Sequence, residues 1–557
     1  MKNSAYLHSL FLFFCLAANA QTFTLVATGS NKQEQATLDS IGYIQKHRNL
    51  DSIKKEGDLL LENAQKKGYL EATYRLTQPS TDSIYRYLFE LRGRTKFVHL
   101  DIKGVKSIFA NSIYPIINDS IRIPYSELSK LLDFGLKKLE AKGESLSKLQ
   151  VTKISKHKNK LIGVFDYLPE KSRTLDALVI RGNTNFPKGY LKSLSKLYRK
   201  NPFNQALVNR LKKEFDSYPF CTQIKSPEIQ FTKDSTSLYI YVQKRSANTF
   251  DGFIGFSNSE TKNITLSGYV DVLLQNILNT GEAVSITWKS NGNQQKSFAG
   301  QVELPYIFNS PIALKAQLQL FKQDSTFQNT KTALHLGYLF RFHKRLYLGY
   351  QSAESSDIQN TNSASLSDFK NYFTSVTYEY ANNTGSDLFF TEKSKLKIEV
   401  GTGSRSTFAK KNKQYFIATV LKQDWQLNDK NHLIIKNDSY YLQSEAYLVN
   451  ELARFGGINS LVGFNENSLQ ANFFSITRTE YRCKFSPSLY WSALVDYGLY
   501  QDQTISSKNS AIAGLGTGIK LATKTGLLNL FYGVGSTKNQ TFNTKNALIH
   551  LSLTSYF

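Results

Sequence analysis

The stretch that decides the fold is FGGINSLVGF, from Phe455 to Phe464. It lies between two segments, Leu433–Leu442 and Leu469–Phe485, in which apolar and polar residues alternate. An alternation with a period of two is typical of β-strands that have one apolar and one polar face. We therefore interpret the rest of the chain as a framework that positions this glycine-rich loop.

The composition favours a membrane β-barrel. Hydrophobic residues make up 41% of the 557 residues, and the chain contains 32 Tyr and 37 Phe, yet its mean hydropathy is −0.35. A chain that is polar on average but rich in Tyr and Phe suits a barrel with lipid outside and water inside. Beyond the N-terminus there is no apolar run of about 18 residues, so a membrane-spanning helix is not expected.

The first twenty residues have the pattern of a secretory signal peptide. Lys2 precedes an apolar run from Leu7 to Leu16, and small residues precede Gln21. Cleavage after Ala20 is expected, since the apolar run is too short for the alternative, a spanning helix. The remaining chain then holds Cys221 and Cys483, two residues that provide neither a disulfide framework nor a zinc site.

The net charge of +25 is concentrated in residues 21–247. A basic surface of this kind could bind nucleic acid, anionic lipid headgroups or acidic polymers. Nucleic acid is the weakest of these for an exported protein, and the chain has no interleaved arginine and aromatic motif. A solvated basic face without a specific ligand is the simplest interpretation.

Residues 21–247 are predicted to hold three copies of one small α+β unit, over 21–96, 97–172 and 173–247. Each copy opens with a short strand, continues through amphipathic helical sequence and closes with two strands, in the order β-α-α-β-β. The opening strands are Phe23–Thr28, Val98–Gly104 and Ala177–Asn183, and the helical segments are Gln33–Lys67, Ser126–Lys142, Lys188–Tyr198 and Asn204–Ser217.

Residues 248–557 are predicted to form an all-β transmembrane barrel of about 16 antiparallel strands. Along Leu489–Tyr500, Val495 and Tyr497 fall on an apolar face and Asp496 falls on the other. On the preceding strand Arg478, Glu480 and Arg482 share one face. These charges are expected in a wet lumen, because a Lys or Arg facing mid-bilayer costs about 2–4 kcal/mol. The structural alternative is a soluble β-sandwich.

The motifs together resemble a known family. LVIRGNTNFP, from Leu178 to Pro187, is similar to the opening of POTRA domains, and with FGGINSLVGF and LVDYG (494–498) it resembles the BamA/TamA superfamily of outer-membrane assembly proteins. DLFFTEKSKL, from Asp387, resembles a periplasmic turn of that family. Three modules are similar to the TamA layout. The resemblance implies an outer-membrane barrel with its N-terminal domains in the periplasm.

The resemblance also implies that FGGINSLVGF is the sixth extracellular loop, folded back into the lumen. Its framework residues would be Gly456, Gly457, Gly463 and Phe464. Where the family has an arginine that pairs with acidic residues of the wall, this chain has Val462. Unpaired buried charge is costly, so we expect Arg478, Arg482 or Arg454 to pair with Glu480 and Asp496 while Val462 packs against apolar groups. The alternative is a weakened loop and a protein that has drifted from the family's activity.

The same resemblance implies a seam between the first and last strands. The candidate seam residues are Phe250, Gly252 and Gly255 on the first strand, and Leu551, Leu553 and Phe557 on the last. Glycines weaken a strand.

The implied function is an outer-membrane protein assembly or translocation factor that receives clients on POTRA modules and inserts them through the seam. Its partners would be outer-membrane lipid, unfolded outer-membrane or secreted proteins, and other assembly subunits, but no nucleic acid. The alternatives are a two-partner-type secretion transporter and a passive barrel. No enzyme, cofactor or metal is expected, because the eight His form no metal-ligand pair and neither GxSxG nor a P-loop occurs.

Overall fold

The computed structural model describes residues 22–77, 83–182, 185–258, 264–291, 295–360, 362–383, 389, 392–538 and 540–557. The expected signal peptide, and most of Asp387–Thr391 at the start of the expected periplasmic turn, lie outside these residues. No helix in the described ranges is long and apolar enough to cross a membrane. The chain divides into two compact units, one formed mainly by residues 1–174 and the other by most of the remaining chain.

The first sheet of the N-terminal unit has the strand order β2-β1-β4-β3. Helices α2 (Lys32–Ile41) and α3 (Leu50–Lys66) each begin after an asparagine whose side chain accepts a backbone N–H, which is a favourable N-cap. The single helical segment predicted over Gln33–Lys67 is therefore two helices, with the short strand β2 (Lys46–His47) between them. The other strands are β1 Phe23–Gly29, β3 Thr73–Leu76 and β4 Ile84–Glu90.

The second sheet, β6-β7-β5-β9-β8, departs from the predicted order. A hairpin of β6 (Ile116–Ile117) and β7 (Ser120–Pro124) follows the short helix α4 (Lys106–Phe109), and β7 pairs with β5. The prediction missed this hairpin because each strand is only two to five residues long. The remaining elements are β5 Phe97–Asp101, α5 Leu128–Ala141, β8 Lys148–His157 and β9 Lys160–Leu168.

A third α+β segment belongs to the same unit as the barrel. Strand β10 runs parallel to β13, with β11 and β12 also paired to β13. Its helices bury an aromatic core that includes Tyr190, Phe215 and Tyr218. The elements are β10 Ala177–Arg181, α6 Lys188–Tyr198, α7 Gln205–Asp216, β11 Cys221–Gln223, β12 Glu228–Phe231 and β13 Thr236–Lys244.

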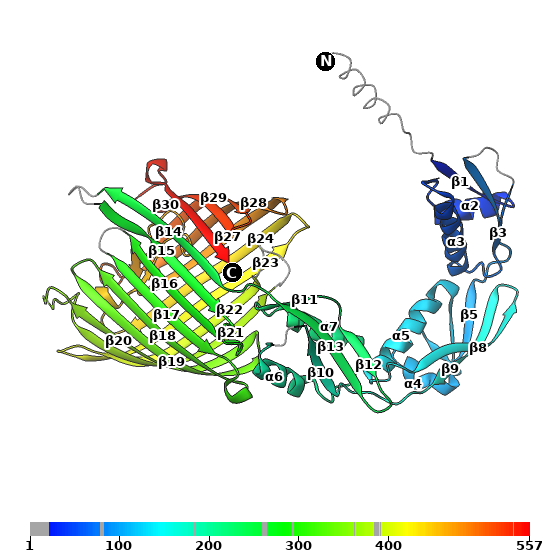
Figure 1. Cartoon of the computed structure of the whole chain (residues 1–557), viewed down its shortest axis with the longest axis horizontal. Coiled ribbons are helices and arrows are strands. Elements are labelled where there is room, and N and C mark those ends of the chain that lie inside the picture. Colours follow the sequence, from blue (N-terminus) through cyan, green and yellow to red (C-terminus); the bar gives the residue numbers. More distant parts are fainter. Residues whose placement is uncertain are drawn as a thin grey trace, which may run out of the picture. The chain divides into compact units, whose positions relative to one another are not determined.

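The C-terminal part is a closed barrel of 16 antiparallel strands (Figure 1). This confirms the predicted fold class and strand number, and the soluble sandwich is wrong. The strands are β14 Thr249–Asn258, β15 Ile264–Gln275, β16 Ala283–Asn291, β17 Lys296–Leu304, β18 Ile312–Gln323, β19 Phe327–Arg341, β20 Lys344–Asp357, β21 Phe369–Asn383, β22 Glu392–Ser406, β23 Lys411–Gln426, β24 Asn431–Ser444, β27 Phe473–Ser486, β28 Leu489–Gln501, β29 Ser510–Ala522, β30 Leu527–Thr537 and β31 Leu548–Tyr556.

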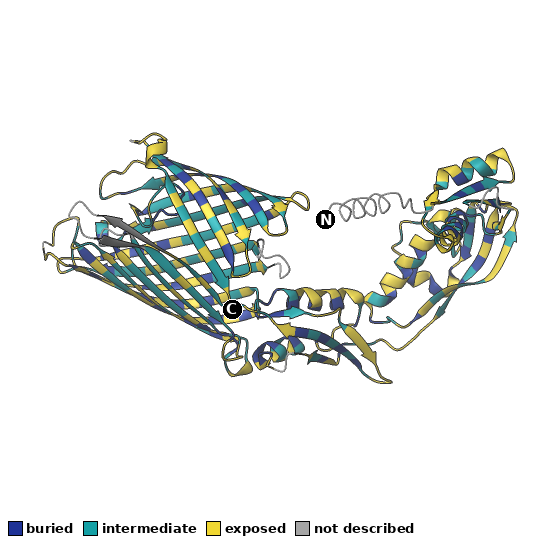
Figure 2. Cartoon of the chain, turned by 45° about the horizontal axis from the view of Figure 1, so that its top comes forward, coloured by how far each residue is buried: buried dark blue, intermediate teal, exposed yellow. Residues whose placement is uncertain are grey.

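The two faces of the barrel wall differ as the alternation predicts. On β28, Val495 and Tyr497 are 49% and 59% exposed, whereas Asp496 between them is fully buried. Exposed and buried residues alternate along the strands in Figure 2. The segment predicted as one strand, Leu469–Phe485, forms two. Leu469–Ala471 is β26, which pairs with β25 and is not a barrel strand, and the barrel strand β27 begins at Phe473.

The third α+β segment packs against three turns at one end of the barrel, which we call the module rim. The ring of Tyr190 lies 4.5 Å from that of Tyr306 between β17 and β18, and its hydroxyl donates to the carbonyl of Gly281 (3.2 Å). The ring of Tyr218 lies 5.0 Å from that of Phe342 between β19 and β20. Burial also raises the pKa of the Tyr190 hydroxyl well above its usual value. These aromatic contacts fix the segment to the barrel.

Replacing Tyr190 with alanine is expected to loosen this contact. Removing a fully buried aromatic ring costs about 3–5 kcal/mol, and here much of the lost packing lies against the barrel turns. Hydrogen exchange of α6 and of the turn at Gly281 should rise by at least tenfold. Tyr190→Phe, which removes the hydroxyl and keeps the ring, is the control and should change exchange little. Unaltered exchange in Tyr190→Ala would show that the contact is not stabilising.

Candidate functional site

The FGGINSLVGF loop belongs to a long connection between β24 and β27. Strands β25 (Ala453–Phe455) and β26 pair with each other on either side of the loop. Within the loop, Leu461 and Val462 are fully buried. Residues of the connection contact strands that are far apart around the wall. Val462 contacts β28, and Glu466 forms an ion pair of 2.8 Å with Lys289 of β16. The loop therefore crosses the lumen.

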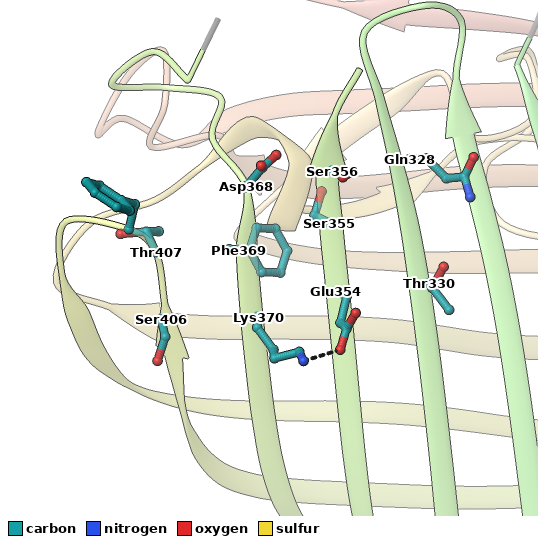
Figure 3. A pocket seen from close by; sticks show the side chains of 11 residues that line it. Gln328, Thr330, Glu354, Ser355, Ser356, Asp368, Phe369, Lys370, Ser406 and Thr407 are labelled. Carbon is teal, nitrogen blue, oxygen red and sulfur yellow. Dashed lines mark ion pairs between the residues drawn. The ribbon is translucent and has the colours of Figure 1, made fainter. Parts of the chain in front are cut away.

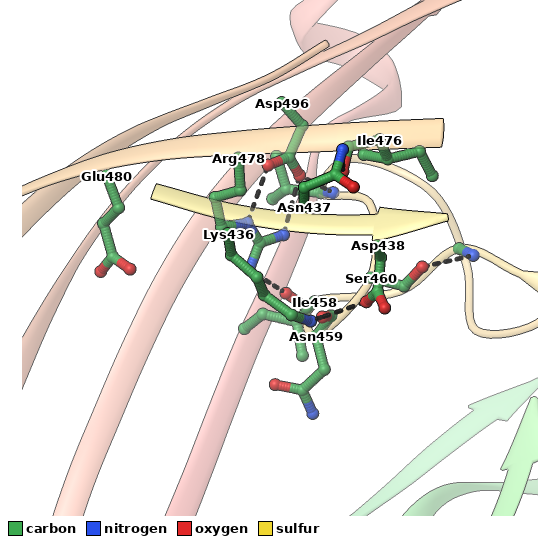
Figure 4. A network of polar contacts seen from close by, with 12 residues as sticks. Lys436, Asn437, Asp438, Ile458, Asn459, Ser460, Ile476, Arg478, Glu480 and Asp496 are labelled. Atoms are coloured by element: carbon green, nitrogen blue, oxygen red, sulfur yellow. Dashed lines mark hydrogen bonds and ion pairs between the residues drawn. The ribbon is translucent and has the colours of Figure 1, made fainter. Parts of the chain in front are cut away.

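Asp496 is the centre of the loop's polar contacts (Figure 4). Arg478 on the neighbouring strand β27 donates to both of its carboxylate oxygens, each at 2.7 Å. The backbone N–H of Val462 donates to the same carboxylate at 2.7 Å. The third guanidinium nitrogen of Arg478 donates to the carbonyl of Ile458 at 2.8 Å. A wall arginine thus supplies the charge, and the loop joins the pair through its backbone.

Glu480 has a separate partner. Arg482 donates to its two oxygens at 2.7 and 2.9 Å. Arg454, the third candidate, lies over the rings of Phe321 and Phe327 at 5.7 and 5.6 Å. Two of the three arginines therefore pair with the two acids, one each.

Val462 lies in a slot lined by glycines, which sequence reasoning missed. Gly514 and Gly516 on β29, and Gly533 and Gly535 on β30, leave room on the inner wall. A Cβ atom on Gly533 would lie 2.4 Å from a methyl group of Val462, and one on Gly514 would lie 2.5 Å from its carbonyl oxygen. The signal was present as glycines at every second position of GLG and GVG, which places them on one face of each strand.

The glycines of the loop itself are required by its path. Gly463 has φ +81° and its α-carbon is so close to β30 that a Cβ would lie 2.1 Å from the amide nitrogen of Gly535. Gly457 has φ +97°, and a Cβ there would lie 2.2 Å from the carboxylate of Glu466. Phe464 lies over Gly535, whose Cβ would clash with the ring at 2.4 Å. Gly456 also has positive φ, +112°. Only glycine fits such positions without strain.

The junction of the first and last strands is short. Strands β14 and β31 pair over four residues, Thr249–Gly252 with Leu553–Tyr556, whereas β14 pairs with β15 over ten and β30 with β31 over seven. Of the candidate seam residues, Phe250, Gly252 and Leu553 lie in the paired part. Gly255 pairs with β15 and Leu551 with β30. Beyond the ladder, the amide of Phe557 donates to the carbonyl of Asn248 at 3.1 Å.

The seam and the loop share one cavity. It has a volume of about 360 Å³. Asp251 and His550 on the seam strands line it together with Lys289 and Glu466, the ion pair that joins the loop to the wall. Movement of the seam strands would therefore alter the surroundings of the Lys289–Glu466 ion pair.

Solved structures that share this architecture include two of CdiB. CdiB from Escherichia coli has 13% identity and a TM-score of 0.51, over 90% of this chain and 97% of that chain. CdiB from Acinetobacter baumannii has 13% identity and a TM-score of 0.51, over 82% of this chain and 86% of that chain. The chain has the CdiB fold.

A weaker likeness joins the chain to BamA from Haemophilus ducreyi lacking POTRA domains 1-3, at 15% identity and a TM-score of 0.46, over 78% of this chain and 94% of that chain. No family model and no curated protein matches the sequence. The CdiB fold agrees with the expected architecture of α+β modules followed by a barrel, and the TamA-like layout stays a prediction.

Proposed function

We propose that the protein is an outer-membrane assembly or translocation factor that passes client polypeptides through the seam between β14 and β31. The observation that carries the proposal is the four-residue ladder that closes the barrel. A net backbone hydrogen bond contributes about 0.5–1.5 kcal/mol, so this junction is the least costly place to open the wall.

An open seam offers a client what the bilayer lacks. An unpaired strand edge in lipid has no water to satisfy its N–H and C=O groups, and each unsatisfied group costs free energy. A client strand therefore enters the bilayer more readily when its edge is already paired. Residues Phe253–Asn258 of β14 extend beyond the pairing with β31. They provide a ready edge to which a client strand can add. No catalytic residue is needed for this function.

The N-terminal sheets would receive the client before insertion. Strand β8 (Lys148–His157) is an edge of the five-stranded sheet and is ten residues long, long enough to pair with an extended segment. We place the signal peptide at residues 1–20, the three receiving modules at 21–96, 97–172 and 173–247 in the periplasm, and the barrel at 248–557 in the outer membrane. Unfolded outer-membrane or secreted proteins would be the clients, and other assembly subunits could bind the modules.

A dedicated transporter for one exported client remains the second candidate, since the CdiB fold alone does not separate it from a general assembly factor. Depleting the protein and quantifying the outer-membrane proteome separates the two. We expect many barrel proteins to fall together by at least twofold. Loss of a single exported protein would favour the dedicated transporter, and an unchanged proteome would overturn both in favour of a passive barrel.

A further inference from the structure

We infer that the outer wall of the barrel carries a binding site for the phosphorylated sugar headgroup of an anionic glycolipid. The site is a cavity of about 450 Å³ across β19, β20, β21 and β22 (Figure 3). The lining residues at outward-facing strand positions are Gln328, Thr330, Glu354, Ser356, Lys370 and Ser406. Ser355, Asp368, Phe369, Thr407 and Phe408 complete the lining.

The strand register shows that these side chains face outward. Thr330, Glu354, Lys370 and Ser406 are successive cross-strand partners in one row. Thr330 on β19 has the same parity as the exposed residues Leu334 and Leu336. Glu354 on β20 has the same parity as the exposed residues Leu348 and Tyr350. The alternate residues Ser355 and Phe369 are buried, and Ser355 accepts a hydrogen bond from Asn450 of the lumenal connection.

The row lies at the level of the headgroups on the side away from the module rim. Lys344 begins β20 at the module rim, and Glu354 follows about ten residues later, which at a rise of about 3.3 Å and a tilt of about 45° spans about 23 Å. The apolar band of an outer-membrane barrel is about 25 Å tall and is flanked by aromatic residues. The stacked rings of Tyr350 and Tyr372, 6.1 Å apart, lie just below the row.

The chemistry of the row suits a phosphorylated sugar. Hydroxyl and amide groups of Thr330, Ser356 and Gln328 can bond sugar hydroxyls, and Lys370 provides a cation beside them. The row continues onto β23 at Lys411, which pairs with Ser406, and Lys413 lies opposite Ser404 in the next row on the same face. Neither Lys411 nor Lys413 takes part in an ion pair among the described residues, so both are available to phosphate. Exposed Phe408 stands at the edge of the cavity.

Substitutions of Lys370 and of Glu354 should change the affinity for a phosphorylated headgroup in opposite directions. They form an ion pair and are each about half exposed, so a bound phosphate competes with Glu354 for the lysine. Removing the acid should tighten binding, and removing the lysine should weaken it. A variant that merely damaged the fold would weaken binding in both cases.

The experiment titrates bis-phosphorylated lipid A into the full-length protein in a zwitterionic detergent. Lys370→Gln with Lys411→Gln should weaken binding about 25-fold, at about fivefold for each lysine beside an anionic lipid. Glu354→Gln should strengthen it several-fold. Lys344→Gln, on the same face at the module rim, is the matched control and should leave affinity unchanged.

Three further probes separate the possible ligands. Dephosphorylated lipid A and phosphatidylglycerol should each bind at least tenfold more weakly than bis-phosphorylated lipid A, and millimolar inorganic phosphate should not displace it. Equal affinity for phosphatidylglycerol, full displacement by phosphate, or no effect of the lysine substitutions would overturn the inference. Because binding is measured without a client, these outcomes are independent of the insertion activity.

Discussion

Replacing Asp496 with alanine is expected to release the FGGINSLVGF loop from the barrel wall. The substitution leaves the guanidinium of Arg478 without its carboxylate, and the side chain of Arg478 is only 12% exposed. Breaking a buried ion pair by removing one partner costs about 3–5 kcal/mol. The Val462 amide loses its acceptor in the same step. Hydrogen exchange of residues 456–464 should rise by at least a hundredfold, and client insertion should fall by at least tenfold.

Glu480→Ala is the matched control for this prediction. Glu480 also receives two hydrogen bonds from one arginine of β27, but none of its hydrogen bonds among the described residues is to the loop. Its loss should affect barrel stability without changing exchange of the loop. Heat-modifiable electrophoretic mobility would show that both variants still form barrels. Equal loop exchange in Asp496→Ala and the native protein would mean that the remaining contacts, such as glycine-slot packing and the Glu466–Lys289 ion pair, are enough to hold the loop.

A disulfide across the seam is expected to abolish client insertion while leaving the barrel folded. Phe250 and Ser555 are directly opposite in the register of β14 and β31. Directly opposed antiparallel residues have α-carbons about 4.5–5.5 Å apart, a separation that a disulfide spans. Cysteines at these two positions would hold the first and last strands together. The locked barrel could not offer its edge to a client.

The native cysteines impose few complications. Cys221 is buried in the third α+β segment, and burial raises the pKa of its thiol to about 12, so it is a poor nucleophile. Cys483 on β27 is partly exposed and would be replaced by alanine. Leu348 and Val376 are opposite one another on β20 and β21. A disulfide between cysteines at these positions locks the wall elsewhere and serves as the control.

Alternation of residues was sufficient to predict the barrel and its inner face. Asp496 and Val495 differ in exposure as their parity requires, because the membrane and the lumen select opposite side chains. Strand ends were predicted less well. One example is β20, which runs from Lys344 to Asp357 although the apolar alternation of its sequence ends at Tyr350. The residues after Tyr350 are polar on both faces once the strand leaves the apolar band, so the alternation disappears.

The loop site was only partly predictable, for a different reason. Paired charges can be inferred from the alternation of two neighbouring strands, because Arg478 and Asp496 both face a partly dehydrated lumen where each must find a partner. The slot for Val462 depends on Gly514 and Gly533, which have no side chain to suggest a contact. Their importance appears only when the loop is placed against them. The short seam was likewise invisible in the sequence, since register is a property of paired strands.

The most direct test of passage through the seam is client insertion into liposomes by the Phe250→Cys, Ser555→Cys protein, in the Cys483→Ala background. Oxidised protein should insert no client above the protein-free rate, and a reductant should restore the rate of the Cys483→Ala parent. The locked control at positions 348 and 376 should insert clients at the parent rate in both conditions. Full insertion by the oxidised seam variant would contradict passage between β14 and β31.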